Sequence, residues 1–596
     1  MSLITACIDF SDPHDSSAPR LRHAFGPPRA VLVARTQEEV RPVLDAVQAA
    51  AVQGAWCVGY LRYEAAPAFD AALAVHDADG PLAWFAVHDE ALPWPDAEPD
   101  HPDAGVQVQW QAGLERPAFD EALGVLQRAI ANGAYYQVNF TAAMTGQLLE
   151  GQGGAGPARA LFHALQRAQP GGYAAFLDTG DEQLLSVSPE LFFDWRAGHL
   201  LTRPMKGTAP RGATPESDAA QADALRASVK ERAENVMIVD LLRNDLSRIA
   251  EPFSVCVPRL FHTEALPAVW QMTSDVQART RAGCSLAEVF AALFPCGSIT
   301  GAPKVRAMQA IRSLELGPRG VYCGAIGVVR PGGAATFNVP IRTVSLRGAQ
   351  VRCGIGSGIT SGSVADGEWQ EWRHKQAFLQ RASMPFEILE TLALEAGRLR
   401  HLDDHLARME AAAVHFGSRW DTAQAHACLQ AVAQAHPQGL WRVRLLLSAS
   451  GKFTAQAYAM EPSPPKVRLQ LADRPLDAVH DEFVRFKTTR RAHYDAFTPT
   501  APDVFDSVLW NAQGEITECT RGNIAMQIEG RWVTPPLACG LLPGVGRARV
   551  LQAGTLTERV VRTDALATVQ GWAFVNSLRG WIDATLVDGA VKPLVP

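Results

Sequence analysis

A short polar stretch at residues 380–385 divides this chain of 596 residues into two regions with different patterns. Its sequence is Gln-Arg-Ala-Ser-Met-Pro, and a new strand pattern begins directly after it at Phe386. Domains typically hold about 50–250 residues around one core, so a chain of this length needs more than one. We therefore predict an N-terminal domain over residues 1–380, a linker at 381–385 and a C-terminal domain over residues 386–596.

Composition and charge argue against two classes of protein. The net charge is only −7, and no basic run is interleaved with aromatic residues, which argues against nucleic-acid binding. No stretch of about 18 apolar residues occurs, so the sequence predicts no membrane span. The ten cysteines are scattered without a Cys-x-x-Cys pair, and the N-terminal residues lack the basic segment of a signal peptide. We expect reduced thiols and a cytoplasmic protein.

Lys206 lies in the sequence Pro-Met-Lys-Gly-Thr at residues 204–208, where proline fixes one backbone angle and glycine frees another. Such a lysine is most often an exposed turn residue. The alternative is an amine held as a nucleophile, which needs a lowered pKa or a nearby base. Glu190 follows a proline and precedes an apolar run, so it is a candidate buried acid with a raised pKa. A turn at residues 196–198 between two strands would bring Glu190 near Lys206.

Several polar positions lie on predicted strands and loops. Gln137 lies on a predicted strand, where a polar side chain usually faces solvent. The Gly/Ser/Thr loop at residues 296–304 opens a helix and so presents backbone N–H groups to an anion. A second glycine-rich loop is predicted at residues 353–358, without the context of a dinucleotide-binding fold. Between the loops, a predicted strand at residues 337–344 carries Arg342, which we expect to pair with a carboxylate.

Acidic residues recur on two predicted helices. Glu368, Glu371 and Lys375 occur at i, i+3 and i+7, which places them on one side of a helix. Residues 230–245 form another predicted helix with acids and bases on its polar face. Two carboxylates from one helix and one from another would suit Mg²⁺, which prefers oxygen ligands. The alternative is a pair of solvated helix faces.

Taken together, these motifs resemble those of the chorismate-utilising enzymes, a family that includes anthranilate, isochorismate, salicylate and aminodeoxychorismate synthases. The resemblance covers residues from about 130 to 380 and implies an α+β fold, an antiparallel β-sheet sandwich with surrounding helices. The stretches that carry it are residues 136–139, 188–190, 233–235, 297–304, 322–327, 341–343 and 354–358, together with Glu371 and Lys375.

The resemblance implies roles for individual residues. Glu234 and Glu371, with Glu368, would hold the Mg²⁺ that binds the ring carboxylate of chorismate. Arg342 and Tyr322 would bind the enolpyruvyl carboxylate. The remaining positions that it assigns to substrate binding are Gln137, Thr208, Thr300, Lys304, Gly356, Ser357, Gly358 and Lys375, of which Lys375 and the 356–358 backbone would hold the other carboxylate.

Two positions distinguish members of this family. Where water-using members carry a base lysine, this chain has Gln137, as the ammonia-using members do. Where anthranilate synthases carry alanine before Gly-Thr, this chain has Lys206, which implies that the amine adds at ring C2 as the C4 hydroxyl leaves, before ammonia attacks C4. Glu190 matches the family's acid/base residue. Gln271 is a departure, because the family usually has histidine there, and the hydrogen bonding of the ring is expected to differ.

The C-terminal region has its own set of motifs. Lys487 follows an aromatic residue, Glu518 lies in the sequence Glu-Cys-Thr-Arg-Gly-Asn, and Arg408 lies on a predicted helix. Taken singly, these are surface charges. Their order resembles the fold-type IV pyridoxal-phosphate enzymes, which implies an α/β domain. There Lys487 would form a Schiff base, Glu518 would protonate the pyridine nitrogen, and Arg408 would bind phosphate. The other cofactor-binding positions would be Asn523, Gly544, Val545 and Gly546.

This second resemblance has two departures. The family's usual Asp-Gly-x-Phe strand is absent or truncated, and the spacing from Lys487 to Tyr494 differs from that of transaminases, so the carry-over of Tyr494 as a partner of the cofactor oxygen is weak. The family includes branched-chain and D-amino-acid transaminases and aminodeoxychorismate lyase. The linked N-terminal region favours the lyase, since it would make the lyase's substrate.

The sequence thus predicts a bifunctional enzyme that makes 4-aminobenzoate for folate from chorismate. No glutamine amidotransferase arrangement of Cys, His and Glu is recognised, so ammonia would come from a separate glutaminase subunit or from solution. Two alternatives stay open: an anthranilate synthase with a C-terminal transaminase, and a synthase whose C-terminal region is a non-catalytic scaffold.

Overall fold

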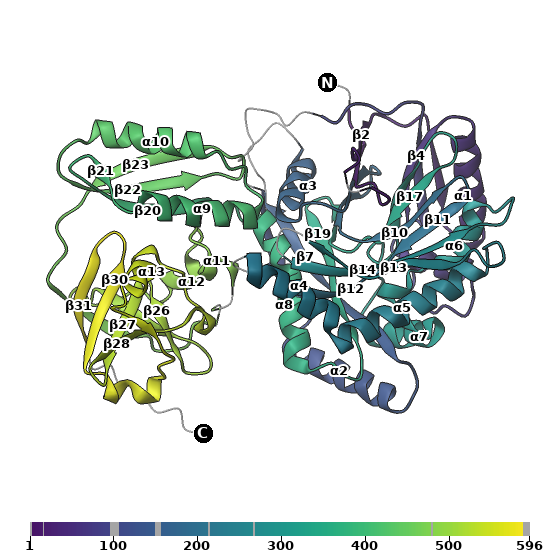
Figure 1. Ribbon diagram of the computed structural model, residues 1–596. Coiled ribbons are helices and arrows are strands. Elements are labelled where there is room, and N and C mark those ends of the chain that lie inside the picture. The colour runs from purple at the N-terminus through teal and green to yellow at the C-terminus, as the bar shows by residue number, and fades with distance from the viewer. Residues whose placement is uncertain are drawn as a thin grey trace. The chain divides into compact units, whose positions relative to one another are not determined.

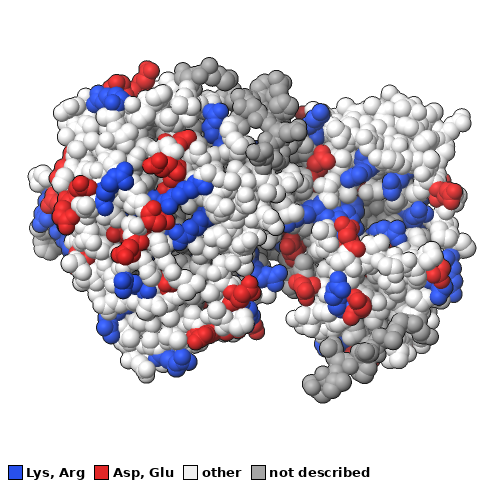
Figure 2. Space-filling view, turned by 180° about the vertical axis from the view of Figure 1, so that it is seen from behind, with Lys and Arg blue, Asp and Glu red and all other residues white. Residues whose placement is uncertain are grey.

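The chain forms two compact units, Met1–Pro385 and Phe386–Pro596, which are described separately (Figure 1). The computed structural model describes residues 3–15, 17–95, 106–149, 156–211, 215–265, 269–477, 479 and 481–587. Within that part of the chain, no helix has the length and apolar character needed to cross a bilayer. On the face shown in Figure 2, acidic and basic side chains are interspersed over both units.

The first unit contains two large sheets, and every strand pairing described in them is antiparallel. The first sheet runs in the order β15 (Gly301–Ala302), β7 (Gln137–Leu149), β19 (Gln350–Ile359), β18 (Thr343–Arg347), β9 (Gln183–Ser188), β8 (Tyr173–Asp178), β1 (Ala6–Phe10) and β2 (Leu21–Phe25), with β6 (Gln107–Gln111) on β7. The second runs β12 (Met205–Pro210), β14 (Val269–Arg279), β11 (His199–Arg203), β10 (Leu191–Arg196), β17 (Ala335–Asn338), β16 (Ala325–Val329), β4 (Trp56–Leu61), β5 (Ala83–His88) and β3 (Ala30–Ala34), with β13 (Cys256–Ala265) on β14.

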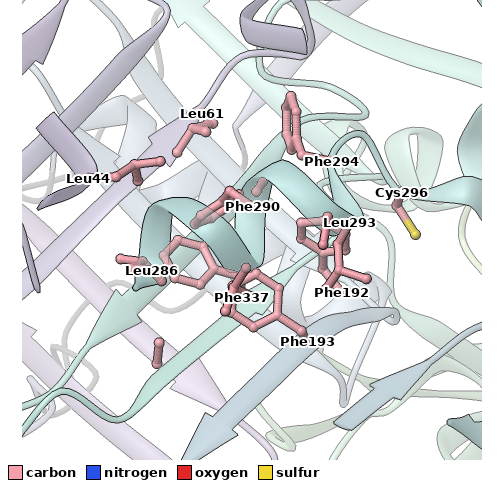
Figure 3. Close-up of a cluster of buried hydrophobic side chains, with 14 of the residues drawn as sticks. Leu44, Leu61, Phe192, Phe193, Leu286, Phe290, Leu293, Phe294, Cys296 and Phe337 are labelled. Atoms are coloured by element: carbon pink, nitrogen blue, oxygen red, sulfur yellow. The ribbon is translucent and has the colours of Figure 1, made fainter. Parts of the chain in front are cut away.

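Each sheet is covered on both faces, because its side chains alternate between two apolar layers. In β4, Val58 and Tyr60 face a core shared by the two sheets, whereas Cys57 and Leu61 face the layer below the helices. Figure 3 shows that outer layer around Phe290. The centre of its ring lies 5.0 Å from the centre of the Phe337 ring in β17. The helices of the unit are α1 (Gln37–Val52), α2 (Arg116–Ala131), α3 (Pro157–Ala168), α4 (Pro215–Ala227), α5 (Val229–Ser247), α6 (Leu286–Leu293), α7 (Lys304–Leu314) and α8 (Ala365–Ser383), with 3₁₀ turns at Tyr63–Ala68 and Gly297–Ile299.

Two helices of this unit carry the predicted acids. Helix α5 begins at Ser228, whose hydroxyl accepts a hydrogen bond from the Glu231 backbone N–H and so caps the helix. In α8 the buried residues recur at helical spacing and include the carboxylate of Glu368, between the apolar neighbours that fix the helix on the first sheet. The two helices therefore present Glu234 and Glu371 from different parts of the fold.

The second unit contains a small antiparallel sheet and a larger mixed one. The small sheet runs β21 (Arg398–Leu399), β20 (Ile388–Glu395), β22 (Leu440–Leu447) and β23 (Phe453–Ala459), and it packs against α9 (Leu402–Phe416) and α10 (Thr422–Ala435). The larger sheet runs β26 (Ile516–Cys519), β25 (Asp506–Trp510), β24 (Lys466–Leu471), β31 (Gly580–Leu586), β30 (Gly571–Asn576), β27 (Asn523–Ile528), β28 (Arg531–Thr534) and β29 (Thr557–Glu558), with α11 (Glu482–Arg485), α12 (Ala492–Asp495), α13 (Val545–Gln552) and 3₁₀ turns at Leu537–Cys539 and Thr563–Thr568.

Three local predictions need correction. Residues 353–358 are not a loop but the middle of β19, paired with β7 along its whole length, because Val351, Cys353 and Ile355 bury one face. Residues 337–344 are not one strand: β17 and β18 belong to different sheets, and Pro340 between them cannot donate to a ladder. The first residues of the predicted linker at 381–385 are helical, since α8 continues to Ser383. Leu379 and Ala382 in this last part of the helix are buried.

The predicted approach of Glu190 and Lys206 is confirmed in its topology. Strands β10 and β11 pair antiparallel, with Arg196 opposite His199 at the turn and Leu191 opposite Arg203 at the far end. The residues that flank this hairpin, Glu190 before it and Lys206 after it, therefore emerge at the same end.

Candidate active sites

The floor of the first site is a face of β19 that carries no side chains. Gly354, Gly356 and Gly358 alternate along this strand, so all three lie on one face. An added Cβ at Gly354 would collide with the Tyr322 ring. At Gly358 it would collide with the Gln137 amide and stand 3.5 Å from the Lys206 amine. The bare strand thus lets predicted site residues from different elements close over it.

Lys206 and Glu190 are linked through one residue, Ser298. The Lys206 ammonium Nζ donates to the Ser298 backbone oxygen at 3.0 Å, and the Ser298 hydroxyl donates to Glu190 Oε1 at 2.7 Å. Burial raises the pKa of Glu190, while the Ser298 hydrogen bond and the Lys206 charge act in the opposite direction. A buried acid with a raised pKa next to an amine is the arrangement that proton transfer requires.

Gln137 completes the centre of this site. Its side chain is fully buried rather than facing solvent, and neither its amide oxygen nor its amide nitrogen has a hydrogen-bond partner among the described residues. Leaving a buried amide unpaired costs about 1–3 kcal/mol for each group. The observed geometry therefore leaves a donor and an acceptor free beside Lys206 for a polar ligand.

The acidic residues lie on α5 and α8 but do not gather around one point. In the described part of the chain, no group of three or more His, Cys, Asp or Glu side chains is placed to hold a metal ion. The predicted cage of Glu234, Glu368 and Glu371 therefore stays a prediction, and two of its members have partners within the protein: Glu371 pairs with Lys375. Glu368 accepts hydrogen bonds from the Ser357 and Ser363 hydroxyls at 2.6 and 2.7 Å.

The donor set nevertheless fits a hard cation. The Lys375 ammonium lies 2.6 Å from Glu371 Oε1 and, against the effect of burial, holds the pKa of Glu371 below its usual range. Burial raises the pKa of Glu234 and of Glu231; neighbouring carboxylates raise it further, whereas the charges of Lys206 and Lys230 lower it. Carboxylates that repel one another and offer oxygen ligands alone match the chemistry that Mg²⁺ prefers.

Arg342 and Tyr322 reach β19 further along the strand. Arg342 adopts a positive φ of 51° and donates to the side-chain oxygen of Gln169. It forms no ion pair with a described carboxylate, contrary to the prediction, because its neighbours here are an amide, a thiol and another arginine. Burial, with the nearby Arg381 charge, lowers the pKa of Arg342 to about 10. A buried guanidinium without a carboxylate is suited to an anionic ligand.

Tyr322 also borders a cavity. This cavity of about 270 Å³ is lined by Tyr322 and Gly354, and its lining also includes Glu182, Arg319 and Arg352. Lys375 extends in the other direction along β19, where its ammonium donates to the Gly356 backbone oxygen at 2.9 Å. Of the predicted carboxylate binders, Tyr322 and Lys375 thus contact the glycine positions of β19, whereas Arg342 lies beside Gln169.

Three predicted substrate-binding side chains have other partners, and a fourth is exposed. The Lys304 ammonium lies 3.0 Å from Asp245 of α5 and 3.3 Å from the Leu293 backbone oxygen, so it ties α7 to its neighbours, because a buried amine needs a buried acceptor. The Thr300 hydroxyl donates to Cys296 and Gly297 backbone oxygens of its own loop. Ser357 is held by Glu368, and Thr208 is exposed on β12.

Two residues near the site were missed in the sequence. Ser298 lies in the loop at 296–304, but the loop suggested backbone rather than side-chain contacts. Glu231 lies one helical turn before Glu234, and an added Cβ at Gly207 would stand 2.8 Å from its carboxylate. The i, i+3 spacing to Glu234 was the available signal. Gln271 donates to the Gly207 backbone oxygen at 2.8 Å and so holds the residue after Lys206.

The second unit brings Lys487 and Glu518 to one place. Lys487 is partly accessible, and its side-chain amine has no hydrogen-bond partner among the described residues; burial and the charges of Arg491 and Arg408 lower its pKa to about 8. Burial raises the pKa of Glu518 to about 8, and this carboxyl accepts hydrogen bonds from the Tyr494 hydroxyl at 2.7 Å and the Leu542 backbone N–H at 3.1 Å. Tyr494 is therefore a partner of Glu518 here.

Arg408 is fixed by a carboxylate that the sequence analysis did not identify. Glu390 of β20 accepts hydrogen bonds from two nitrogens of Arg408, at 2.8 and 2.7 Å, and lies 2.6 Å from His405 Nδ1. Against the effect of burial, these partners lower the pKa of Glu390 to about 2. A third nitrogen of Arg408 donates to the Pro543 backbone oxygen at 3.1 Å, which places the guanidinium beside the start of α13.

The start of α13 has the form of a phosphate cradle. An added Cβ at Gly544 would collide with the Asn523 amide, and at Gly546 it would collide with the backbone of Asn576 and Ser577. Asn523 also donates to the Leu542 backbone oxygen at 3.0 Å, which fixes the loop that precedes Val545. A bare helix N-terminus, an arginine, an amine of lowered pKa and a buried carboxyl fit pyridoxal phosphate.

Comparison with known proteins agrees with this geometry. Residues 14–381 match the chorismate binding enzymes, and the chain belongs to that family. Residues 387–587 match the class IV amino-transferases. The crystal structure of anthranilate synthase component I from Streptococcus pneumoniae TIGR4, 22% identical, superposes with a TM-score of 0.52 over 63% of this chain and 92% of that one, which shows the same fold.

Curated relatives also match part of this chain in sequence. Aminodeoxychorismate synthase component 1 of Klebsiella aerogenes is 42% identical over 266 residues, which are 44% of this chain and 57% of that protein. Aminodeoxychorismate synthase of Streptomyces griseus is 44% identical over 268 residues, 45% of this chain and 36% of that protein. Anthranilate synthase component 1 3 of Haloarcula marismortui is 35% identical over 50% of this chain and 58% of that protein. The chain thus spans about half the length of the curated relatives it matches.

The Lys304–Asp245 pair gives a test of the structural role of Lys304. Lys304→Met should lower the stability of the first unit by about 3 kcal/mol, because it leaves a buried carboxylate without its cation. The double variant Lys304→Met/Asp245→Asn should recover most of that loss. Urea unfolding measures both effects. If the double variant is stable but its KM for chorismate rises tenfold or more, Lys304 binds substrate and the structural assignment is wrong.

Proposed function

We propose that the first unit converts chorismate and ammonia to 4-amino-4-deoxychorismate, and that the second releases pyruvate from this product to leave 4-aminobenzoate. The observation that carries the first half is the placement of Lys206 beside the unpaired amide of Gln137 and, through Ser298, beside Glu190. Ammonia would come from a separate glutamine amidotransferase subunit or from solution.

In this mechanism, Lys206 is the nucleophile of the first reaction. Its amine bonds to ring C2 while the ring double bonds shift and the C4 hydroxyl leaves as water with a proton from Glu190. Ammonia, held by the Gln137 amide, then bonds to C4, the double bonds shift back and the bond to Lys206 breaks. Arg342, together with Tyr322, would hold the enolpyruvyl carboxylate of chorismate, and Lys375 would hold the other carboxylate.

Mg²⁺ would neutralise the acidic residues above this face. Glu234 and Glu371 would hold it, with Glu231 and Glu368 beside them. When bound, the cation supplies a positive charge for the ring carboxylate, which otherwise approaches like charges.

In the second unit, Lys487 and Glu518 would carry the chemistry. Bound pyridoxal phosphate supplies an electron sink for charge that develops on the substrate carbon bearing the amine. Glu518 would hold a proton at the pyridine nitrogen, and Arg408 with the Gly544–Gly546 backbone would hold the phosphate. Lys487, released when the substrate amine takes its place, would remove the proton from that carbon, and the ring becomes aromatic as pyruvate leaves.

Replacement of Lys206 separates a covalent role from a charge role. Lys206→Ala and Lys206→Arg should both fold, and both should form aminodeoxychorismate at least about 100-fold more slowly, because neither offers the amine. Product analysis by chromatography, with chorismate, ammonium and Mg²⁺, measures this and detects any anthranilate. A wild-type rate and product in Lys206→Arg would show that only the charge matters.

Metal dependence tests the acidic residues. Glu371→Gln should raise the Mg²⁺ concentration for half-maximal synthase activity by about tenfold or more, because one of a few oxygen ligands is lost. Glu251→Gln, on the exposed surface of the same unit, is the control. Chelation should stop the first reaction and leave release of pyruvate from added aminodeoxychorismate intact. Synthase activity that survives chelation contradicts the metal assignment.

Lys487→Ala tests the second unit. This variant should lack the visible absorbance of bound pyridoxal phosphate and should accumulate aminodeoxychorismate without forming 4-aminobenzoate, since the Lys206 site is in the other unit. Lys466→Ala, which changes an exposed lysine of β24, should behave as the wild type. If Lys487→Ala still makes 4-aminobenzoate at the wild-type rate, the second unit is a scaffold and not a lyase.

A further inference from the structure

Arg491 lies in the second candidate site but has no part in the chemistry described above. It immediately precedes α12, four residues after Lys487. Its guanidinium carbon is 4.7 Å from the centre of the Tyr494 ring, and one nitrogen donates to the Thr520 backbone oxygen. The Tyr494 hydroxyl donates in turn to Glu518, so the guanidinium rests on the pair that would face the cofactor ring.

The two arginines of this site differ in their partners. Arg408 is held by the Glu390 carboxylate through two hydrogen bonds. Arg491 forms no ion pair with a carboxylate in the described ranges, and its contacts there are a backbone oxygen and an aromatic face. The charge of Arg491 acts on both reactive groups, since it lowers the pKa of Lys487 and opposes the raised pKa of Glu518. A half-buried cation of this kind is suited to an anion that the protein itself does not supply.

We propose that Arg491 binds a carboxylate of the second unit's substrate and so selects amines that carry an anionic group close to the reacting nitrogen. The inference rests on the proposed function, because it assumes that the substrate amine takes the place of Lys487. In aminodeoxychorismate the enolpyruvyl group is on the ring carbon next to the one that bears the amine. The enolpyruvyl carboxylate therefore lies near the substrate nitrogen. Because that nitrogen takes the place of the Lys487 amine, the carboxylate comes near Arg491.

The geometry favours a fixed, two-point contact. A guanidinium stacked on an aromatic ring keeps its plane, and Arg presents paired N–H groups that match the two oxygens of a carboxylate. The Thr520 backbone oxygen takes one nitrogen of Arg491 and leaves the others for a ligand. A simple amino acid substrate has only its α-carboxylate to place at Arg491. A ring substrate with an enolpyruvyl ether instead places the enolpyruvyl carboxylate there, from the ring carbon next to the one that bears the amine.

The test uses the full chain loaded with pyridoxal phosphate. Chorismate is the probe for binding, because it has both carboxylates but a hydroxyl in place of the amine, and without ammonia and Mg²⁺ the first unit leaves it unchanged. Its binding to the second unit is read from the visible band of the cofactor, which the first unit does not affect. The variants are Arg491→Gln, Arg491→Lys and the control Arg490→Gln, whose guanidinium stacks 4.5 Å from the Phe483 ring centre.

Arg491→Gln should retain the cofactor band and weaken chorismate binding about 10- to 100-fold, the range for loss of a charged hydrogen-bond pair. Its KM for aminodeoxychorismate should rise by a similar factor with a smaller change in kcat. Arg491→Lys should fall between Arg491→Gln and the wild type, and Arg490→Gln should match the wild type. Unchanged KM and unchanged chorismate binding in Arg491→Gln overturn the proposal.

A wild-type measurement keeps the test decisive if Arg491→Gln loses the cofactor. The wild-type protein should bind chorismate at least about tenfold more tightly than 4-hydroxybenzoate, which lacks the enolpyruvyl carboxylate. Equal binding of the two ligands overturns the proposal. Failure of the proposed function is a separate result, since a wild-type chain that forms no 4-aminobenzoate still reports anion binding through the cofactor band.

Discussion

The bare face of β19 is the constraint on which the first site depends. Gly354, Gly356 and Gly358 are the positions at which a side chain would fill the space taken by Tyr322, Thr141 and Gln137. Because the opposite face of the same strand is buried in the apolar core, the strand cannot turn or slip by one residue without exposing that core. The packing of the sheet thus fixes which face is bare, and the bare face fixes where the site lies.

Charge is handled differently in the two sites. In the first, the carboxylates of α5 and α8 raise one another's pKa, and Arg342 has no carboxylate partner among the described residues. In the second, Glu390 neutralises Arg408, so the cation at the cradle is held in place before any ligand binds. The first site thus keeps like charges together where the proposed ligands carry the opposite charge, whereas the second site fixes its cation in advance.

The sequence predicted which residues come together where a motif combined special backbone with a reactive group. Lys206 before its glycine and Glu190 after its proline were identified in this way. Strands β10 and β11 between them pair as a hairpin, as expected. The same kind of reasoning went wrong for the glycines of β19, which a local pattern assigned to a loop. Glycine is depleted in strands, and only pairing with β7 along the whole strand overrides that preference.

The sequence by itself determined the two-unit organisation, the order of the motifs and the identity of most residues around Lys206 and Lys487. Tertiary structure alone decided which side chains remain available: Lys304 pairs with Asp245, whereas Gln137, Arg342 and Arg491 keep capacity for a ligand. The physical reason is that hydrogen-bond and charge partners come from distant parts of the chain, at separations such as the 59 residues between Lys304 and Asp245. Local sequence specifies what a side chain is able to bind, and packing specifies what it already binds.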